Sequence, residues 1–90
     1  MPALIFSPNF KKEYKSIVKR NTKLEKKIKQ KVKFFLAKPQ HSSLRVHKIY
    51  SPQVGEVFSF WIEKDLRIIF NWVGKNKVIF YRIGNHKQVY

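Results

Sequence analysis

The feature that most constrains this fold is a change in hydrophobic spacing near Pro39. Before it, apolar residues recur at the intervals of an amphipathic helix. The first such stripe is Phe10, Tyr14, Ile17 and Val18, and the second is Leu24, Ile28, Val32, Phe35 and Leu36. After Pro39 the apolar residues alternate with polar ones or form short runs, as in strands. The chain therefore predicts two helices followed by a sheet, which is an α+β domain.

Local signals set the limits of these elements. Ala3–Phe6 is predicted as a short edge strand, and Ser7 followed by Pro8 is typical of a helix N-terminus. Thr22, with Glu25 three residues later, predicts a capping box for the second helix. Four further strands are expected at Leu44–Ile49, Val57–Ile62, Leu66–Val73 and Lys77–Ile83. The expected order is β-αα-ββββ, with an antiparallel helical hairpin packed on one side of a small antiparallel sheet.

Charge is the second constraint. The 90 residues allow a single domain, 1–90, which carries 20 Lys and Arg against 5 Asp and Glu, a net charge of +15. Residues 1–38 hold 12 of these basic residues, all lysine except Arg20. Because this density of like charge opposes the compact state, we expect a polyanion or an acidic protein as the partner.

Composition also excludes several classes of protein. The chain has no cysteine, which excludes a disulfide framework and a thiolate nucleophile. No apolar run approaches the roughly 20 residues of a membrane span. The first residues lack the basic segment of a signal peptide, so a cytoplasmic protein is expected.

Few residues are candidates for catalysis or metal binding. The scarcity of carboxylates argues against a two-metal nuclease, and the histidines have no metal-binding spacing, so no metal or cofactor is expected. RNA can be cleaved without metal, because the ribose 2′-OH attacks the adjacent phosphate once a base takes its proton. Arginine stabilises the charge of that transition state, and His, Lys or Tyr can transfer the protons. Arg67 and Arg82, on neighbouring strands, can reach one phosphate if they share a face, and His86 and Tyr90 follow closely.

Several segments resemble the RelE/ParE superfamily of toxins from toxin–antitoxin modules. They are Ser7-Pro8-x-Phe10-x-Lys12, Leu44–Lys48, Gly55–Ser59, Asp65–Phe70 and Arg82–Tyr90. The last two are the most specific, because an arginine between apolar strand residues and a closing Ile-Gly-x-His-x-x-Val-Tyr are similar to the RelE-like branch of mRNA interferases. The resemblance covers nearly the whole chain and implies a small curved sheet with an N-terminal helical hairpin.

This resemblance implies an endoribonuclease that binds the ribosomal A site and cleaves the mRNA there, without metal, through a 2′,3′-cyclic phosphate. Arg67 and Arg82 would hold the scissile phosphate. His86 would be the general acid or base, and Tyr90 would stack on a base or assist proton transfer. Secondary candidates for the site are His47, Lys48 and Glu63. The residues expected to contact RNA and the ribosome are Lys12, Lys19, Lys23, Lys27, Lys31 and Arg45.

One departure and two other functions stay open. Many relatives have an acidic residue directly after the late histidine, whereas Lys87 leaves His86 without an orienting carboxylate. The ParE-like branch shares the fold but inhibits DNA gyrase by binding. A non-catalytic nucleic-acid-binding module, whose strand aromatics stack on bases, is the third candidate. For a toxin, the expected partners are an acidic antitoxin that covers the basic surface and adds stability, the 70S ribosome and mRNA.

Overall fold

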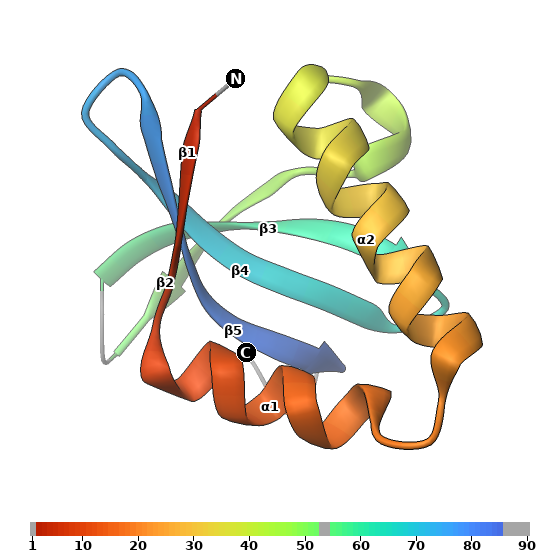
Figure 1. Cartoon of the computed structure of the whole chain (residues 1–90). Coiled ribbons are helices and arrows are strands. Elements are labelled where there is room, and N and C mark those ends of the chain that lie inside the picture. The colour runs from red at the N-terminus through yellow and green to blue at the C-terminus, as the bar shows by residue number, and fades with distance from the viewer. Residues whose placement is uncertain (1, 53–54, 86–90) are drawn as a thin grey trace.

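The computed structural model of the chain describes residues 2–52 and 55–85. Its helices are α1 (Pro8–Val18) and α2 (Thr22–Ala37), followed by a short 3₁₀ helix, η1 (Ser42–Leu44). Its strands are β1 (Ala3–Phe6), β2 (His47–Ser51), β3 (Gly55–Glu63), β4 (Leu66–Val73) and β5 (Lys77–Asn85) (Figure 1). This order confirms the α+β fold with β-αα-ββββ connectivity.

The strands form one sheet in the order β1-β5-β4-β3-β2. The last four strands are an antiparallel meander, as predicted. Strand β1 takes the expected edge position but runs parallel to β5, with Ala3 paired to Lys77 and Phe6 to Phe80. The sheet is therefore mixed rather than wholly antiparallel, because the two helices carry the chain back across the sheet after β1.

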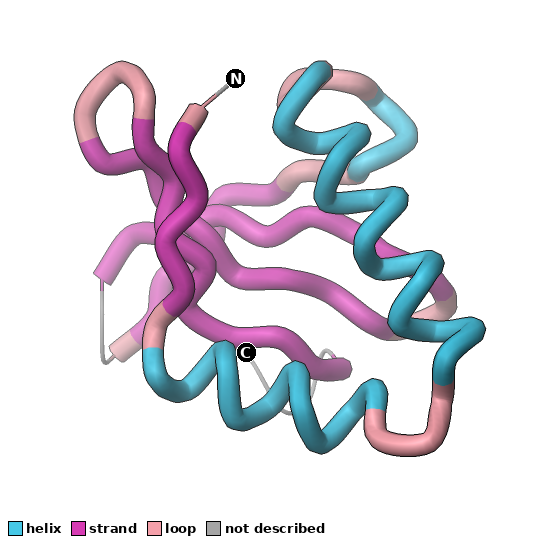
Figure 2. Tube along the Cα trace, in the orientation of Figure 1, coloured by secondary structure: helices cyan, strands magenta, loops and turns pink. Residues whose placement is uncertain are grey.

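The main core lies between the sheet and the helices, which cover the same side (Figure 2). At its centre Phe35 of α2 packs among buried phenylalanines of the three central strands, Phe60, Phe70 and Phe80. Phe35 stacks on Phe60 with ring centroids 4.3 Å apart. Fully burying a side chain of this size contributes roughly 1.5–3 kcal/mol, so these contacts hold α2 on the sheet.

Both helices begin at side-chain caps, but one cap differs from the prediction. Ser7 caps α1 as expected, its Oγ accepting a hydrogen bond from the Phe10 N–H at 3.0 Å. The cap of α2 is Asn21, whose Oδ1 accepts a hydrogen bond from the Leu24 N–H at 3.1 Å, and the expected Thr22 is the first helical residue. Asparagine caps a helix as well as threonine does, which explains the shift by one residue.

The helices do not form the expected antiparallel hairpin. They diverge from the loop that joins them, α1 along β5 and α2 across the sheet (Figures 1 and 2). Each helix buries its own stripe on the sheet: Phe10 packs on Phe80 with centroids 5.4 Å apart, as Phe35 does on Phe60. Because each helix packs mainly on the sheet, the two helices make few contacts with each other.

The strand expected at Leu44–Ile49 starts later. Leu44 ends η1 and is fully buried, Arg45 has left-handed backbone with φ 49°, and β2 begins at His47. Leu44 is apolar because its side chain is buried in the core, and not because it belongs to the alternating pattern of a strand.

Candidate functional site

Arg67 and Arg82 leave the sheet on the same face. Arg82 is paired with Ile69, and Arg67 lies two residues before Ile69 on β4. Directly paired residues share a face, and so do residues two apart on a strand. Both side chains therefore leave the sheet on the side opposite the main core. Such diagonal neighbours lie roughly 7–8 Å apart, and Gly84, which is paired with Arg67, adds no side chain between them.

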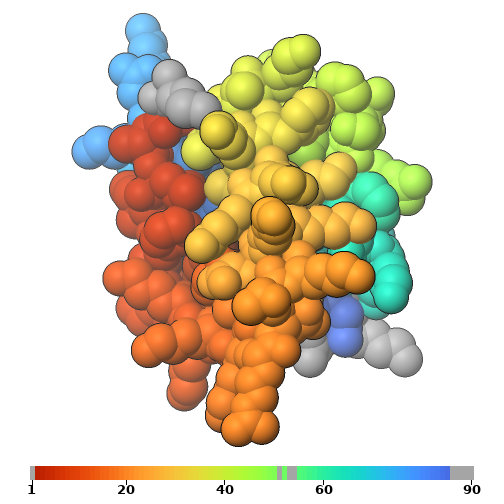
Figure 3. Space-filling model, turned by 45° about the vertical axis from the view of Figure 1, so that its right-hand side comes forward, coloured from red at the N-terminus to blue at the C-terminus, as the bar shows by residue number. Residues whose placement is uncertain are grey.

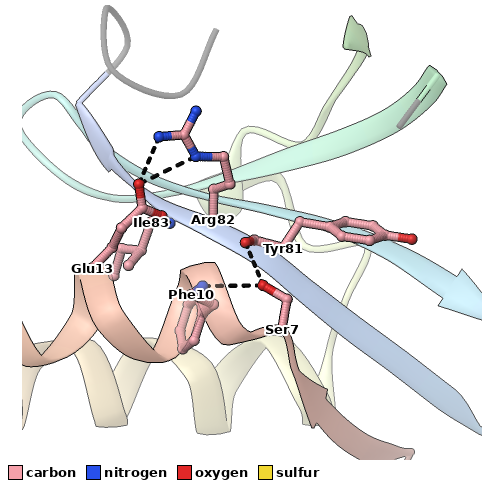
Figure 4. A network of polar contacts seen from close by, with 6 residues as sticks. All are labelled: Ser7, Phe10, Glu13, Tyr81, Arg82 and Ile83. Atoms are coloured by element: carbon pink, nitrogen blue, oxygen red, sulfur yellow. Dashed lines mark hydrogen bonds and ion pairs between the residues drawn. The ribbon is translucent and has the colours of Figure 1, made fainter. Parts of the chain in front are cut away.

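Glu13 of α1 holds Arg82 (Figure 4). Its Oε2 accepts hydrogen bonds from Arg82 Nη2 at 2.7 Å and Nε at 3.2 Å. Its Oε1 accepts a bond from the Ile83 N–H at 3.1 Å, and so covers the edge of β5 beyond the residues that pair with β1. The Arg82 side chain keeps 41% of its surface exposed, so a second anion can reach it.

Sequence reasoning did not single out Glu13. A signal was present: Glu13 lies three residues after Phe10 and four before Ile17, and therefore on the apolar stripe that meets the sheet. A lone carboxylate on a buried stripe needs a partner, and Arg82 supplies it.

Ser7 fixes this part of α1 on β5. Besides capping the helix, its Oγ donates a hydrogen bond to the Tyr81 carbonyl at 2.6 Å (Figure 4). Its N–H donates to the Phe80 carbonyl at 3.0 Å. The pairing of β4 with β5 is irregular at this point, between Ile69 and Phe70. The helix is thus attached immediately before Arg82.

The secondary candidates are divided between the two faces. A row of paired residues crosses the sheet from His47 to Arg82 through Ser59 and Ile69, so His47 shares the arginine face. Strands are about 4.8 Å apart, which places the backbones of His47 and Arg82 about 14 Å from each other. His47 therefore lies on the same surface without touching Arg82.

Lys48 and Glu63 are not brought to the arginine face. Lys48 is paired with Phe58, whose side chain packs towards the main core, and its Nζ lies 3.5 Å from Glu56. Glu63 follows a register shift in β3, and its Oε1 lies 2.9 Å from Nζ of Lys27 on α2. His86 and Tyr90 lie outside the described residues.

The six residues expected to bind RNA also separate into groups. Lys12 shares a surface hollow of about 480 Å³ with Glu13 and Arg82. Lys19 and Lys23 are exposed near the loop between the helices. Lys27 and Lys31 lie in the middle of α2, where Lys27 pairs with Glu63. Lys31 and Arg45 both contact the Trp61 ring.

An apolar groove of about 1030 Å³ lies between β1, α1 and α2. Figure 3 shows its walls, with β1 and α1 in red and α2 in orange to yellow. Its apolar residues are Phe6, Phe10, Tyr14, Ile28, Val32 and Leu36. Its charged residues are Lys11, Lys12, Lys15, Lys29 and Lys33. The groove exists because the helices diverge, which is why the sequence did not indicate it.

Tyr14 lines this groove and links the helices. Its hydroxyl lies 3.5 Å from Oε2 of Glu25 on α2. Burial raises the pKa of Tyr14 above 10.0, and the charge of Glu25 and its hydrogen bond raise it further. Tyr14 therefore stays neutral and donates a hydrogen bond to Glu25 throughout the neutral pH range.

Residues 2–52 and 55–85 contain neither a metal-binding cluster nor a membrane-spanning helix. No group of three His, Asp or Glu side chains there is arranged to hold a metal ion. Neither described helix is long and apolar enough to cross a bilayer.

Comparisons with known proteins show which fold and which family this architecture belongs to. No curated protein is significantly similar to the chain in sequence. Among solved structures, YafQ in the E. coli DinJ–YafQ complex matches with a TM-score of 0.78 and 22% identity, over 100% of this chain and 99% of that one. A metal-bound toxin from Helicobacter pylori matches with a TM-score of 0.74 and 22% identity, over 100% of both chains.

A YoeB dimer from Staphylococcus aureus matches with a TM-score of 0.68 and 21% identity, over 94% of this chain and 97% of that one. At these identities the structures establish a shared fold. The family model of the ParE toxin of type II toxin–antitoxin systems, parDE, matches residues 4–90. The chain therefore belongs to the ParE toxin family, within the RelE/ParE superfamily, and is the toxin of a type II toxin–antitoxin system.

Proposed function

We propose that this toxin is an endoribonuclease that cleaves mRNA in the ribosomal A site without a metal ion. The observation that carries the proposal is the common face of Arg67 and Arg82. Guanidinium groups at diagonal positions of neighbouring strands can bind one phosphate from two sides. They can also stabilise the additional negative charge that this phosphate acquires in the transition state.

The proposed reaction needs two proton transfers. The ribose 2′-oxygen forms a bond to phosphorus and loses its proton to a base, while the bond to the 5′-oxygen breaks and that oxygen takes a proton from an acid. The products are a 2′,3′-cyclic phosphate and a 5′-hydroxyl. We assign these transfers to His86 and Tyr90, with His47 on the arginine face as a further candidate.

Glu13 has a place in this proposal. It orients the Arg82 guanidinium through two hydrogen bonds, and the exposed remainder of the side chain is free to meet the phosphate. The lysines of the helices, which are mostly exposed, would bind ribosomal RNA without sequence preference, and this binding would weaken steeply with salt.

We further propose that an acidic antitoxin neutralises the toxin and that one of its helices occupies the apolar groove. The groove combines an apolar floor with five lysines, which fits an amphipathic helix bearing Asp and Glu on its outer face. The related fold of YafQ occurs in a toxin–antitoxin complex with DinJ. Such a partner would also relieve the repulsion of the +15 charge.

Inhibition of DNA gyrase is the second candidate, because the matching family model is that of the ParE toxin. In that case the face would bind a protein surface, and the ion pair of Arg82 with Glu13 would be purely structural.

In-vitro translation followed by primer extension on the mRNA tests the proposal. The wild type is compared with Arg67→Ala, Arg82→Ala and a charge-matched control, Lys75→Ala, in the exposed turn between β4 and β5. Discrete cuts in the A site should appear with the wild type and the control and fall about 100-fold or more in the two arginine variants. Intact mRNA during continued translation would remove the nuclease, and inhibition of gyrase supercoiling would then support the second candidate.

A further inference from the structure

Trp61 holds two cations at the edge of β3. The ring centroid of Trp61 lies 4.7 Å from Cζ of Arg45 and 5.1 Å from Nζ of Lys31. The indole N–H donates a hydrogen bond to the Lys64 carbonyl at 2.8 Å, which fixes the orientation of the ring. A cation over an indole face is attracted by the negative charge of that face, so Trp61 restrains both side chains.

The backbone also restrains Arg45. Its φ of 49° and ψ of 51° are left-handed, which is uncommon for a residue with a Cβ. The fully buried side chain of Leu44 precedes it, and the Arg45 N–H donates to the Ser42 carbonyl at 3.1 Å. An arginine held in a strained conformation by the surrounding fold is a reason to look for a function.

Arg45 continues the row of residues that contains Arg67, and Lys31 reaches the Trp61 ring from α2. Strand β2 starts at His47, opposite Ser59, so Arg45 occupies the place across from Trp61 just before the ladder begins. Trp61 itself is paired with Arg67. Two strand spacings, about 10 Å, therefore separate the backbones of Arg45 and Arg67 along one line across the sheet.

The surroundings of the cluster are polar and basic. Beside it lies a hollow of about 260 Å³ lined by Lys27, Gln30, Lys31, Phe34 and Ser43. The nearby carboxylate of Glu63 is neutralised by Lys27 at 2.9 Å. An anion that approaches Lys31 and Arg45 thus meets hydrogen-bond donors and no uncompensated negative charge from Glu63.

We propose that Arg45 and Lys31, positioned by Trp61, form a second phosphate-binding subsite for single-stranded RNA. A strand whose scissile phosphate lies at Arg67 and Arg82 would place the phosphate of a neighbouring nucleotide at Arg45 and Lys31. A polynucleotide fits better here than an acidic helix, because a helix needs an apolar floor, which lies in the groove instead. The inference rests on the proposed function for the identity of the strand and adds where the strand runs and what holds it.

Salt-dependent binding tests the subsite directly. The probe is a short, fluorescent 2′-O-methyl oligoribonucleotide, which has no free 2′-OH and cannot be cleaved by the proposed reaction. In a plot of log affinity against log salt, Arg45→Asn and Lys31→Ala should each reduce the slope by about 0.7 for the lost contact. Asparagine is chosen because it tolerates left-handed backbone. The control Lys75→Ala removes the same charge from the β4–β5 turn, at the other end of the sheet (Figure 1), and should leave the slope unchanged.

The positioning role of Trp61 has its own readout. Trp61→Leu leaves both cations in the chain but should reduce the salt slope towards that of the Arg45 and Lys31 variants. Trp61→Phe retains an aromatic face, so its salt slope should stay close to that of the wild type. Melting temperatures of all variants show whether each one is folded. A reduced salt slope in a folded variant therefore reflects a lost contact with RNA and not a loss of stability.

Three results would overturn the subsite. These are unchanged slopes in folded Arg45 and Lys31 variants, an equal reduction in Lys75→Ala, and equally good competition by an oligoglutamate, which would indicate an acidic protein as the ligand. The proposed function fails separately. If the variants reduce the slope but the wild type does not cleave mRNA, the subsite is supported and the nuclease is refuted. If the wild type cleaves mRNA in the A site but the slopes are unchanged, the nuclease is supported and the subsite is refuted.

Discussion

At the scale of single residues, the carboxylate of Glu13 connects three parts of the molecule. It lies on α1, it satisfies a backbone N–H at the edge of β5, and it binds the guanidinium of Arg82. Hydrogen bonds to a charged group contribute more than neutral ones, but the exposed part of Arg82 is screened by water. Glu13 therefore stabilises the packing of α1 on the sheet and also sets the position of Arg82.

Glu13→Gln should lower the free energy of unfolding by about 1 kcal/mol, because the amide loses the charge that strengthens these bonds. The matched control is Glu25→Gln, which removes the same charge from α2 where the contacts to Tyr14 and Lys29 are 3.5 and 3.9 Å long. It should cost less than about 0.5 kcal/mol. Urea denaturation measures both, and equal losses would show that Glu13 has no special role.

Tyr14 predicts a pH dependence at the alkaline end. Burial, with the charge and hydrogen bond of Glu25, raises its pKa in the folded chain above 10.0. The stability gained from the neutral phenol is complete below the unfolded pKa and is lost as the pH rises through the folded pKa. Between about pH 9 and about pH 11 the wild type should thus lose more stability than Tyr14→Phe, which cannot ionise. Thermal melts of both across this range check it, and parallel curves would contradict it.

At the scale of elements, the N-terminus of α1 is fixed more firmly than that of α2. The side chain of Asn21, the cap of α2, accepts one hydrogen bond in an exposed position. The cap of α1, Ser7, makes its helix bond and also holds the carbonyl of Tyr81 next to the irregular pairing in β5. Helix α1 is thus joined to the strand that carries Arg82 at both Ser7 and Glu13.

Ser7→Ala should therefore destabilise the chain more than Asn21→Ala. Loss of a helix cap costs about 0.5–2 kcal/mol, and we expect Ser7→Ala near the upper end and Asn21→Ala near the lower. Chemical denaturation of both variants gives the comparison. If Asn21→Ala proved equally costly, the bond from Ser7 to Tyr81 would contribute nothing to stability.

Much of this level of structure is predictable from local patterns, and the exceptions have physical causes. Helical and strand periodicity, with Ser7 and Pro8, locates α1, α2 and the five described strands to within a few residues but does not indicate η1. The direction of β1 and the angle between the helices depend on which surfaces the assembled sheet leaves open, and no local pattern records that.

The partner of Glu13 is 69 residues away in the chain, and the left-handed backbone of Arg45 follows from the burial of its neighbour Leu44. The shared face of Arg67 and Arg82 needs the register between β4 and β5, which is likewise non-local.

At the scale of the whole molecule, charge should make folding and RNA binding respond to salt in opposite directions. With a net charge of +15, raising sodium chloride from about 0.05 to about 0.5 M should raise the melting temperature, because salt screens the repulsion. The same change should weaken binding of the oligoribonucleotide. The rise should be smaller for the double variant Lys23→Gln and Lys26→Gln, which removes two exposed charges from α2. A melting temperature that does not respond to salt would show that repulsion is not a significant cost.

The pairing of β1 with β5 has a consequence for the synthesis of the toxin. Strand β1 leaves the translating ribosome early, but its partner is the last of the described strands to be made. Until then β1 has no neighbour, α1 has neither Phe80 to pack on nor Tyr81 to bond, and Arg82 does not yet exist. An incomplete chain therefore cannot present the two-arginine face, and the fold of the toxin is completed only after nearly all of the described residues have been joined.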